Sequence, residues 1–402
     1  MADAFIYDAL RTPRGAGRPS GGLHTLSPID LGATVLTALA ERTGCDRADI
    51  DDVVFGCGDP VEDQGADLAR SSLLRAGFDE RISGSVVTRF CSSGLDASNA
   101  AAARIMAGQA DCMIAGGVEM MSLVPIGGTG GPWGSDAEFN TLTNYAPLGV
   151  AADLVATLDG HTRDDVDAYA VESQKRAARA WNDGRFARSI IPVNDFNGTL
   201  CLARDEHPRP NTDVASLAKL KPAFEGMATK GGFGDTVRKR YPQVNRLNHV
   251  HTAGNSAGIV DGASAILLGS EKLGRELDLK PRARFVSFAT VGCDPCLMLT
   301  APVDATRKCL SRAGLTLDDI DLFEVNEAFA SVVLHFMQET GVSHDRVNVN
   351  GGAISLGHPI GATGTILTGT LLDELERTGG KHGVVTLCVG LGMGVATLIE
   401  RV

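Results

Sequence analysis

The chain has 402 residues, too many for one small core, and its 44% hydrophobic and 21% charged content is ordinary for a folded protein of two or more domains. A net charge of −12 argues against nucleic-acid binding, which depends on clustered lysine and arginine. No basic leader or membrane-length apolar run is present, and nine scattered cysteines indicate reduced thiols, so we expect a cytoplasmic protein.

The first half of the chain alternates strand-like and helix-like segments. In it, an acidic turn at residues 49–51 leads into the apolar run 52–55. The pattern returns near the other end of the chain, where residues 312–314 and 319–321 match 42–44 and 49–51 at one constant offset. Apolar runs that alternate with helices predict α/β layers, here in two related halves. Duplicated halves suggest an active site where the two meet.

Cys91 is the first candidate for chemistry. It lies between a strand-like run, residues 86–90, and a helix-like run, residues 97–109. A cysteine at a helix N-terminus has its thiolate stabilised by the backbone dipoles. On placement alone, however, a free cysteine is more often a small, buried and inert side chain.

The middle of the chain, residues 123–250, has a different character. It contains a glycine-rich stretch at 127–134, an amphipathic helix predicted at 164–180, and a segment rich in lysine and glycine at 219–239. We interpret it as an inserted loop domain that covers a ligand, since long segments of this kind are often functional. The alternative is an ordinary surface excursion.

Two polar residues of the second half follow as candidates. Asn326 comes directly after an apolar strand-like run, where it could hold a water molecule, assist an oxyanion, or simply cap a helix. His358 is flanked by glycine and proline, and Gly361 and Gly364 follow it, which predicts a rigid turn that presents the imidazole. Histidine is the natural base for a thiol at neutral pH, although a lone histidine is more often a satisfied polar residue.

Cys388 completes the set of reactive residues. It ends an apolar strand-like run and enters a turn with Gly390, Gly392 and Gly394, which offer backbone N–H groups and space for a substrate. No Lys-Ser or Lys-Thr pair follows, so a phosphate-binding P-loop is unsupported. Two thiols and one imidazole suit a reaction that needs a nucleophile, a base and a separate acid.

Taken together, four motifs resemble those of the thiolase family, the 3-ketoacyl-CoA and acetoacetyl-CoA thiolases. They are residues 91–94, 326–329, 357–361 and 388–392, and the resemblance extends over essentially the whole chain. Within the family the sequence is most similar to the thiolase subunit of bacterial fatty-acid oxidation complexes, and residues 248–255 contribute to that likeness.

The resemblance implies an α/β fold with two duplicated βαβαβαββ domains that form a layered α/β/α/β/α core, plus an inserted loop domain. We expect residues 1–122 and 251–272 to make the N-terminal domain. Residues 123–250 would form the loop domain that covers CoA, and residues 273–402 the C-terminal domain.

The resemblance also implies roles for the reactive residues. Cys91 is expected to be the nucleophile that accepts the acyl group, His358 its base, and Cys388 the acid that protonates the enolate of acetyl-CoA. Asn326 is expected to hold a water molecule against the enolate oxygen, and the backbone N–H groups of Cys91 and Gly390 to bind the thioester oxyanion. The reaction is a reversible Claisen condensation in which coenzyme A is a co-substrate and no cofactor is permanently bound.

Five further residues are expected to contact substrate or CoA by the same resemblance. They are Lys221, Ala253, Ser256, Met298 and Phe329. Lys221 stands where relatives often carry arginine, and a lysine loses the bidentate geometry. Ala257 stands where many relatives have serine, which puts the pantetheine contacts in doubt. Pro147 lies in the segment 145–149, where short-chain biosynthetic relatives often carry His-Met-Gly, and a proline cannot supply an imidazole, which weakens an acetoacetyl-specific assignment.

Several alternatives remain. A decarboxylating ketoacyl synthase shares the superfamily fold but uses one cysteine and two histidines, and Cys388 and Asn326 argue against it. Other interpretations are a biosynthetic acetoacetyl-CoA thiolase and a non-catalytic acyl-CoA carrier or scaffold.

Cys293 and Cys296 form a C-x-x-C pair without two further zinc ligands, so we expect no metal site.

The expected partners follow from these assignments. We expect acyl-CoA and CoA as ligands, a homodimer or homotetramer, and a hydratase/dehydrogenase subunit as a further partner by resemblance. We expect no nucleic-acid partner and no integral membrane segment.

Overall fold

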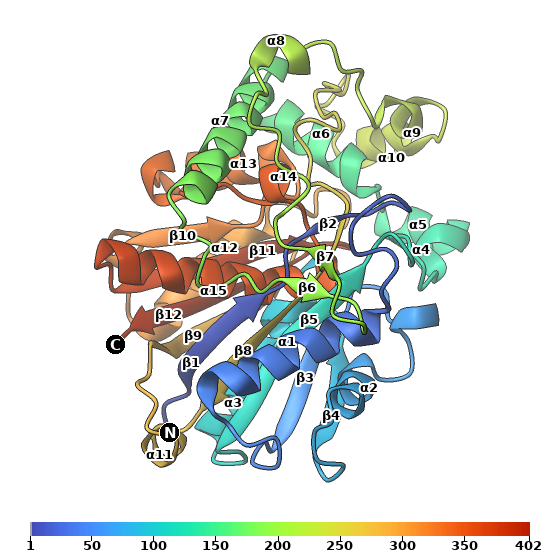
Figure 1. Ribbon diagram of the computed structural model, residues 1–402. Helices are drawn as coiled ribbons and strands as arrows, with labels where there is room; N and C mark the ends of the chain where they lie inside the picture. The colour runs from blue at the N-terminus through green and yellow to red at the C-terminus, as the bar shows by residue number, and fades with distance from the viewer. Residues whose placement is uncertain (1) are drawn as a thin grey trace.

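The computed structural model describes residues 2–402 and divides the chain into two similar halves (Figure 1). The first half comprises β1 (Phe5–Arg11), β2 (Gly15–Ala16), α1 (Pro28–Thr43), β3 (Asp52–Gly56), α2 (Leu68–Arg75), β4 (Ser83–Val87), α3 (Ser93–Met106), β5 (Cys112–Met120) and, after a long insertion, β8 (Val260–Gly269) and α11 (Glu271–Glu276). The second half comprises β9 (Ala283–Gly292), α12 (Ala301–Ala313), β10 (Leu322–Val325), α13 (Ala330–Thr340), α14 (Ala353–Leu356), α15 (Ile360–Thr378), β11 (His382–Val389) and β12 (Met393–Arg401).

The sequence repeat corresponds to a structural repeat. Helices α1 and α12 both end at a glycine in the left-handed region, Gly44 with φ 66° and Gly314 with φ 69°, a conformation that costs glycine little. Each helix then leads into a buried parallel strand, β3 or β10. The first half follows the order βαβαβαββ. In the second half the third strand is reduced to a single bridge between Phe323 and Val347.

One mixed sheet runs through both halves. Its strand order is β10-β11-β12-β9-β1-β8-β5-β3-β4, with β2 paired to β8 at the side. The halves join through a short antiparallel pairing of β1 with β9, at Phe5–Arg284 and Ile6–Ala283. Strands β5 and β8 are buried along their whole length, as the uninterrupted apolar runs predict for strands covered on both faces.

Three apolar cores separate the layers. One lies between α1 and α2 and the first half of the sheet, and another contains α12 and α13 against the second half. Between them, α3 and α15 pack side by side, and their residues Leu95 and Leu371 share a core with Met113 and Val395 from the two halves of the sheet. The α/β/α/β/α layering expected from the resemblance is confirmed, and the two central helices, α3 and α15, each begin two residues after a candidate catalytic residue, Cys91 and His358.

The insertion between β5 and β8 is mostly helical. It contains α4 (Pro132–Ser135), α5 (Ala137–Thr143), α6 (Leu148–Asp159), α7 (Arg163–Asn182), β6 (Val193–Asn194), β7 (Leu200–Leu202), α8 (Val214–Leu217), α9 (Glu225–Thr229) and α10 (Phe233–Arg240). Helices α6 to α10 gather at one end of the molecule, above the sheet (Figure 1). The helix predicted at residues 164–180 is confirmed as α7. The domain boundaries at 122, 250 and 272 stay a prediction.

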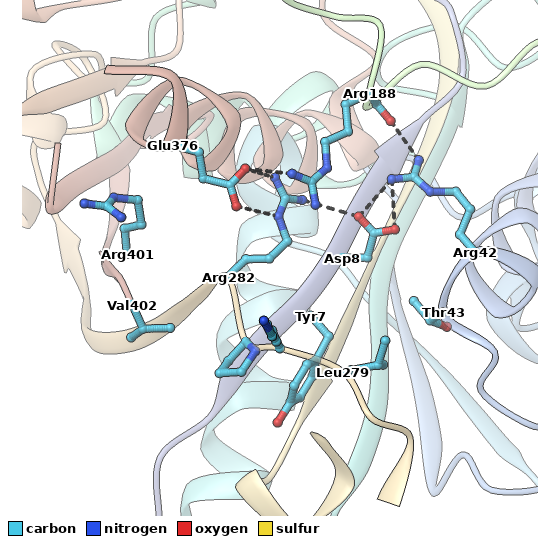
Figure 2. Close-up of a pocket in the computed structure, with 12 residues that line it drawn as sticks. Tyr7, Asp8, Arg42, Thr43, Arg188, Leu279, Arg282, Glu376, Arg401 and Val402 are labelled. Carbon is cyan, nitrogen blue, oxygen red and sulfur yellow. Dashed lines mark hydrogen bonds and ion pairs between the residues drawn. The ribbon is translucent and has the colours of Figure 1, made fainter. Parts of the chain in front are cut away.

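An ion-pair network joins the two halves on the side shown in Figure 2. Arg282, which is 7% exposed, binds Asp8 of β1 as well as Asp373 and Glu376 of α15. Arg42 of α1 also binds Asp8, at 2.9 Å. Asp8, Arg42, Arg282 and Glu376 border a polar depression of about 530 Å³, and none of the candidate catalytic residues lines it. Within residues 2–402, no helix has both the length and the hydropathy to cross a membrane.

Candidate active site

Cys91 occupies a strained turn before α3. The turn is a short 3₁₀ segment, Phe90–Ser92, and Phe90 has φ 45°, a left-handed conformation that is costly for an aromatic residue. Ser93 supports the turn because its hydroxyl donates to the carbonyl of Phe90 at 2.7 Å and accepts from the N–H of Arg89 at 2.9 Å. Cys91 is thereby placed at the entrance to the central helix, as the sequence predicts, with 7% of its surface exposed.

The thiol of Cys91 is protonated at neutral pH. Burial raises its pKa to about 11, and the carboxylates of Glu119 and Asp59 add to the effect. Backbone N–H groups of Gly390 and of Cys91 itself point at the sulfur and oppose this shift. The same two N–H groups can stabilise negative charge that develops beside the sulfur.

The imidazole of His358 has a defined tautomer. Its Nδ1 lies 2.6 Å from the hydroxyl of Thr363, and that hydroxyl donates to the carbonyl of Pro359 at 2.9 Å. Thr363 therefore accepts a hydrogen bond from Nδ1–H, which leaves Nε2 as the basic nitrogen. The side-chain amide of Asn326 lies 3.4 Å from that Nε2. Sequence reasoning missed Thr363, because no spacing rule links it to the histidine.

His358 is neutral in the folded protein. Its pKa is lowered to about 3, mainly by burial and to a smaller extent by the guanidinium of Arg14. A neutral imidazole can accept the proton of a neutral thiol only as the sulfur attacks, so Cys91 and His358 do not form an ion pair at rest.

Asn326 is not a helix cap, since α13 begins four residues later behind Phe329. Its backbone N–H donates to the carbonyl of Thr386 at 3.0 Å, which ties it to β11. Its side-chain Oδ1 is buried and has no protein hydrogen-bond partner. A buried carbonyl of this kind normally accepts from water or a ligand, which agrees with the predicted water-holding role.

Cys388 approaches from the end of β11. Burial raises the pKa of its thiol well above the usual value, and the nearby Cys91 adds to the shift. After it the chain turns through Leu391 and Gly392, with φ 69° and 84°, and returns as β12. This turn brings the N–H of Gly390 to the Cys91 sulfur. Strand β11, which carries Cys388, and helix α15, which follows His358, both contact the turn that holds Cys91.

One prediction from the sequence is wrong. Gly361 and Gly364 do not form a rigid turn, because α15 already begins at Ile360. They allow the helix to approach its neighbours closely instead. A Cβ on Gly361 would lie 2.5 Å from the carbonyl oxygen of Gly56, and one on Gly364 would lie 2.2 Å from the N of Leu95. The two glycines therefore allow α15 to pack closely against the first half of the chain.

A cavity of about 260 Å³ opens beside Cys91 and Gly390. Its wall is mainly apolar and includes Ile126, Trp133, Tyr145, Leu148, Met298 and Leu391. Of the described residues that line it, none is lysine or arginine, and its charged group is Asp59. That carboxylate already accepts hydrogen bonds from the backbone of Gly127 and Thr129. The cavity can hold an uncharged, apolar group next to the thiol.

The other expected ligand contacts are more dispersed. Met298 lines the cavity, whereas Lys221, Ala253, Ser256 and Phe329 do not. Lys221 and Ala253 are exposed. The hydroxyl of Ser256 donates to the carbonyl of Thr252 at 2.8 Å, and Phe329 packs edge-on against Phe224 and His251. Their predicted roles in CoA binding remain a prediction.

Sequence reasoning also missed Glu119 and Trp133. Glu119 is buried and accepts hydrogen bonds from the N–H groups of Gly58 and Gly361, at 2.6 and 2.7 Å, so it joins the two halves beneath Cys91. Trp133 lies near the end of the glycine-rich stretch 127–134, in the short helix α4. Among residues 2–402 no group of three or more metal-ligating side chains occurs, and Cys293 and Cys296 are free thiols.

Comparisons with known proteins agree with this geometry. Two family models match the chain, "Thiolase, N-terminal domain" over residues 4–237 and "Thiolase, C-terminal domain" over residues 279–401. The 3-ketoacyl-CoA thiolase of Aliivibrio fischeri is 40% identical over 408 residues, and the beta-ketoadipyl-CoA thiolase of Acinetobacter baylyi is 40% identical over 424 residues; each alignment covers 100% of both chains. The crystal structure of the Bacillus anthracis acetyl-CoA acetyltransferase matches with a TM-score of 0.85 at 33% identity, covering 100% of this chain and 99% of that one.

Proposed function

Because the chain belongs to the thiolase family and is an acyltransferase that acts on acyl-CoA, we propose that it is a degradative 3-ketoacyl-CoA thiolase. It cleaves a 3-ketoacyl-CoA with free CoA and yields acetyl-CoA and a shortened acyl-CoA. The observation that carries this proposal is the apolar cavity beside Cys91, with the thiol of Cys388 close to the same sulfur. No tightly bound cofactor is required, since CoA is the co-substrate.

In the first half-reaction, Cys91 attacks the 3-keto carbon while its proton passes to Nε2 of His358. The bond between C2 and C3 then breaks, and its electron pair becomes the enolate of acetyl-CoA. Cys388 protonates C2, because its raised pKa keeps the thiol protonated at neutral pH. The imidazolium and a water molecule held by Asn326 stabilise the enolate oxygen. The acyl group remains on Cys91 as a thioester.

In the second half-reaction, CoA attacks this thioester and gives its thiol proton to the Cys388 thiolate. The N–H groups of Cys91 and Gly390 stabilise the tetrahedral oxyanion, because they already face the sulfur to which the carbonyl is bonded. When the intermediate collapses, Cys91 leaves as a thiolate and takes its proton back from His358. All protons are then restored, and the cycle is ping-pong.

The cavity favours one type of acyl group. The relative from Acinetobacter baylyi carries the name beta-ketoadipyl-CoA thiolase, and an adipyl group ends in a carboxylate. In this chain such a carboxylate would enter a mainly apolar cavity whose charged lining group is the anionic side chain Asp59. Burial of an unpaired charge is costly, so an uncharged alkyl chain is favoured.

The test is CoA-dependent cleavage across 3-ketoacyl-CoAs from C4 to C16, with 3-ketoadipyl-CoA as the charged comparison and products identified by mass spectrometry. Cleavage that increases with chain length supports the proposal. Activity confined to acetoacetyl-CoA would instead establish the biosynthetic type. Incubation with acyl-CoA should add the acyl mass to Cys91, and a chain that never acquires this mass would be a carrier or scaffold.

The proposal extends to assembly and location. We propose a cytoplasmic homodimer or homotetramer of fatty-acid oxidation that associates with a hydratase/dehydrogenase subunit. Light scattering of the purified chain measures the oligomer. Recovery of the chain from its own cells as a stable oligomer without any other protein would contradict the proposed association with a hydratase/dehydrogenase subunit.

A further inference from the structure

One wall of the cavity beside Cys91, the acyl cavity, belongs to a segment with little packing of its own. Residues 125–143 include α4 and α5, which lie at one side of the molecule (Figure 1), and no side chain in this range is buried. Ile126 is 53% exposed although it lines the cavity. Gly127 and Gly131 have φ of 84° and 104°, which glycine adopts at little cost. Packing alone therefore holds this wall weakly.

The hydrogen bonds that attach this segment to the first half of the chain end at one carboxylate. Asp59 accepts from the N–H of Gly127 and the N–H of Thr129, each at 3.0 Å, and from the Thr129 hydroxyl at 2.9 Å. Within the described residues, 125–135 make no other hydrogen bond to any group outside 125–140. Hydrogen bonds to a charged acceptor are stronger than neutral ones, so these three bonds form a latch.

Asp59 is itself fixed in place. It is 5% exposed, its N–H donates to Glu119 at 3.3 Å, and its carbonyl accepts from the side chain of Gln64 at 2.9 Å. Glu119 also accepts from Gln64 at 2.7 Å and from the N–H of Gly361 at the start of α15. The glycine-rich segment is therefore attached to a carboxylate whose position the core of the molecule sets.

Trp133 is the largest side chain that the attached segment brings to the cavity. It lines the cavity from α4, and its ring packs against Phe139 and Tyr145, with centroids 4.7 and 5.2 Å apart. Only three residues separate it from Thr129, and Ile126 directly precedes Gly127. Loss of the latch would consequently move Ile126 and Trp133 away from the cavity together.

We propose that Asp59 is a positioning residue for substrate selection, which holds Ile126 and Trp133 against the acyl chain through its latch with Thr129. The inference rests on the proposed cleavage of 3-ketoacyl-CoA. A long alkyl group on Cys91 gains apolar contact with the latched wall. An acetyl group has only a methyl beyond its carbonyl and gains little from it. The latch therefore favours long acyl groups over short ones.

The kinetic test compares Thr129→Val, Asp59→Asn and Ser135→Ala with the wild type on 3-ketodecanoyl-CoA and acetoacetyl-CoA. The ratio of the two kcat/KM values measures selection of chain length, and effects common to both substrates, such as a change at the Cys91 thiol, cancel in it. Thr129→Val removes one hydrogen bond to a charged group, so the ratio should fall by roughly tenfold, mainly through the KM of the longer substrate.

The other two variants bracket this result. In Asp59→Asn an NH₂ group that cannot accept replaces one carboxylate oxygen, so the ratio should fall at least as far as in Thr129→Val. Ser135→Ala is the matched control, because its hydroxyl lies in the same segment but donates to the carbonyl of Gly131 at 3.1 Å. Its ratio should equal that of the wild type.

A spectroscopic measurement tests the latch without turnover. The chain has two tryptophans, so Trp181→Phe leaves Trp133 as the single reporter. In this background, acrylamide quenching of Trp133 fluorescence should increase in Thr129→Val and Asp59→Asn and stay unchanged in Ser135→Ala, because release of the segment exposes the partly buried ring. Thr129 is exposed, so Thr129→Val still provides the test if Asp59→Asn fails to fold.

Two results would overturn the inference. One is quenching of Trp133 that stays at the wild-type level in Thr129→Val and in folded Asp59→Asn. The other is increased quenching with a wild-type ratio of kcat/KM, which would show that the wall moves without affecting substrate selection. A wild type that cleaves neither substrate would refute the proposed function, and the quenching would still decide whether the latch exists.

Discussion

Cys91 and His358 form a neutral pair at rest, because burial raises the pKa of the thiol to about 11 and lowers that of the imidazole to about 3. Below the thiol pKa, the thiolate fraction increases about tenfold for each pH unit. Alkylation of Cys91 by iodoacetamide should therefore increase with this slope from pH 6 to pH 9. Peptide mass spectrometry measures the rate at Cys91 itself.

A free cysteine derivative is the control for this experiment. Its rate should level off above its pKa of about 8.5, whereas the rate at Cys91 should continue to increase. A plateau at Cys91 below pH 8 would mean that the resting enzyme holds a thiolate–imidazolium ion pair.

Cys388 has a role that can be separated from that of Cys91. Replacement by alanine removes the general acid for C2 and leaves the nucleophile and its base in place. We expect Cys388→Ala to lose roughly 10²–10⁴-fold in cleavage, the usual contribution of a general acid. Acylation of Cys91 by acyl-CoA should be lost only in part, because CoA can leave as a thiolate without the proton that Cys388 supplies. Steady-state cleavage and the mass of the acyl-enzyme measure the two properties. Loss of both to the same extent would contradict separate roles.

At the scale of elements, the site depends on how closely α15 approaches β5. A Cβ on Gly117 of β5 would lie 2.0 Å from the carbonyl oxygen of Gly361, and backbone cannot yield as a flexible side chain can. We expect Gly117→Ala to destabilise the protein by about 1–3 kcal/mol, the usual cost of overpacking, and to displace His358, which directly precedes α15. Urea unfolding and kcat measure these effects.

Gly226 provides the matched control. It lies in α9, and a methyl group at this position would have nothing within 4 Å outside its own helix turn. Gly226→Ala should therefore be neutral or stabilise the protein by about 0.5–1 kcal/mol. Equal effects of Gly117→Ala and Gly226→Ala on the free energy of unfolding would show that α15 and β5 leave room for an additional methyl group.

At the scale of the whole molecule, Arg282 links the halves through three carboxylates. Its removal leaves Asp8, Asp373 and Glu376 without their shared cation in a largely buried place. We expect Arg282→Ala to lower the free energy of unfolding by about 3–5 kcal/mol, the cost of breaking a buried ion pair. Lys272→Ala, which removes an exposed pair with Asp111, should cost less than about 1 kcal/mol. Similar urea midpoints for Arg282→Ala and Lys272→Ala would contradict a stabilising role of the Arg282 ion pairs between the two halves.

The sequence predicts the repeat, the layered fold and the motif residues well, because glycine turns, apolar periodicity and reactive side chains are local signals. Thr363 and Glu119 could not be predicted, since each matters through its tertiary surroundings. The helical position of Gly361 was also missed, because a glycine signals a turn locally and only tertiary packing shows that α15 needs it.

The position of β1 has a consequence for how the chain is made. Its residues Phe5–Arg11 lie in the middle of the sheet, and their main partner is β8, about 250 residues further along. At synthesis rates of about 5–20 residues per second, roughly 10–50 s pass before that partner leaves the ribosome. During this interval an apolar strand that will be central remains unpaired. The nascent chain should therefore depend on chaperones until β8 emerges.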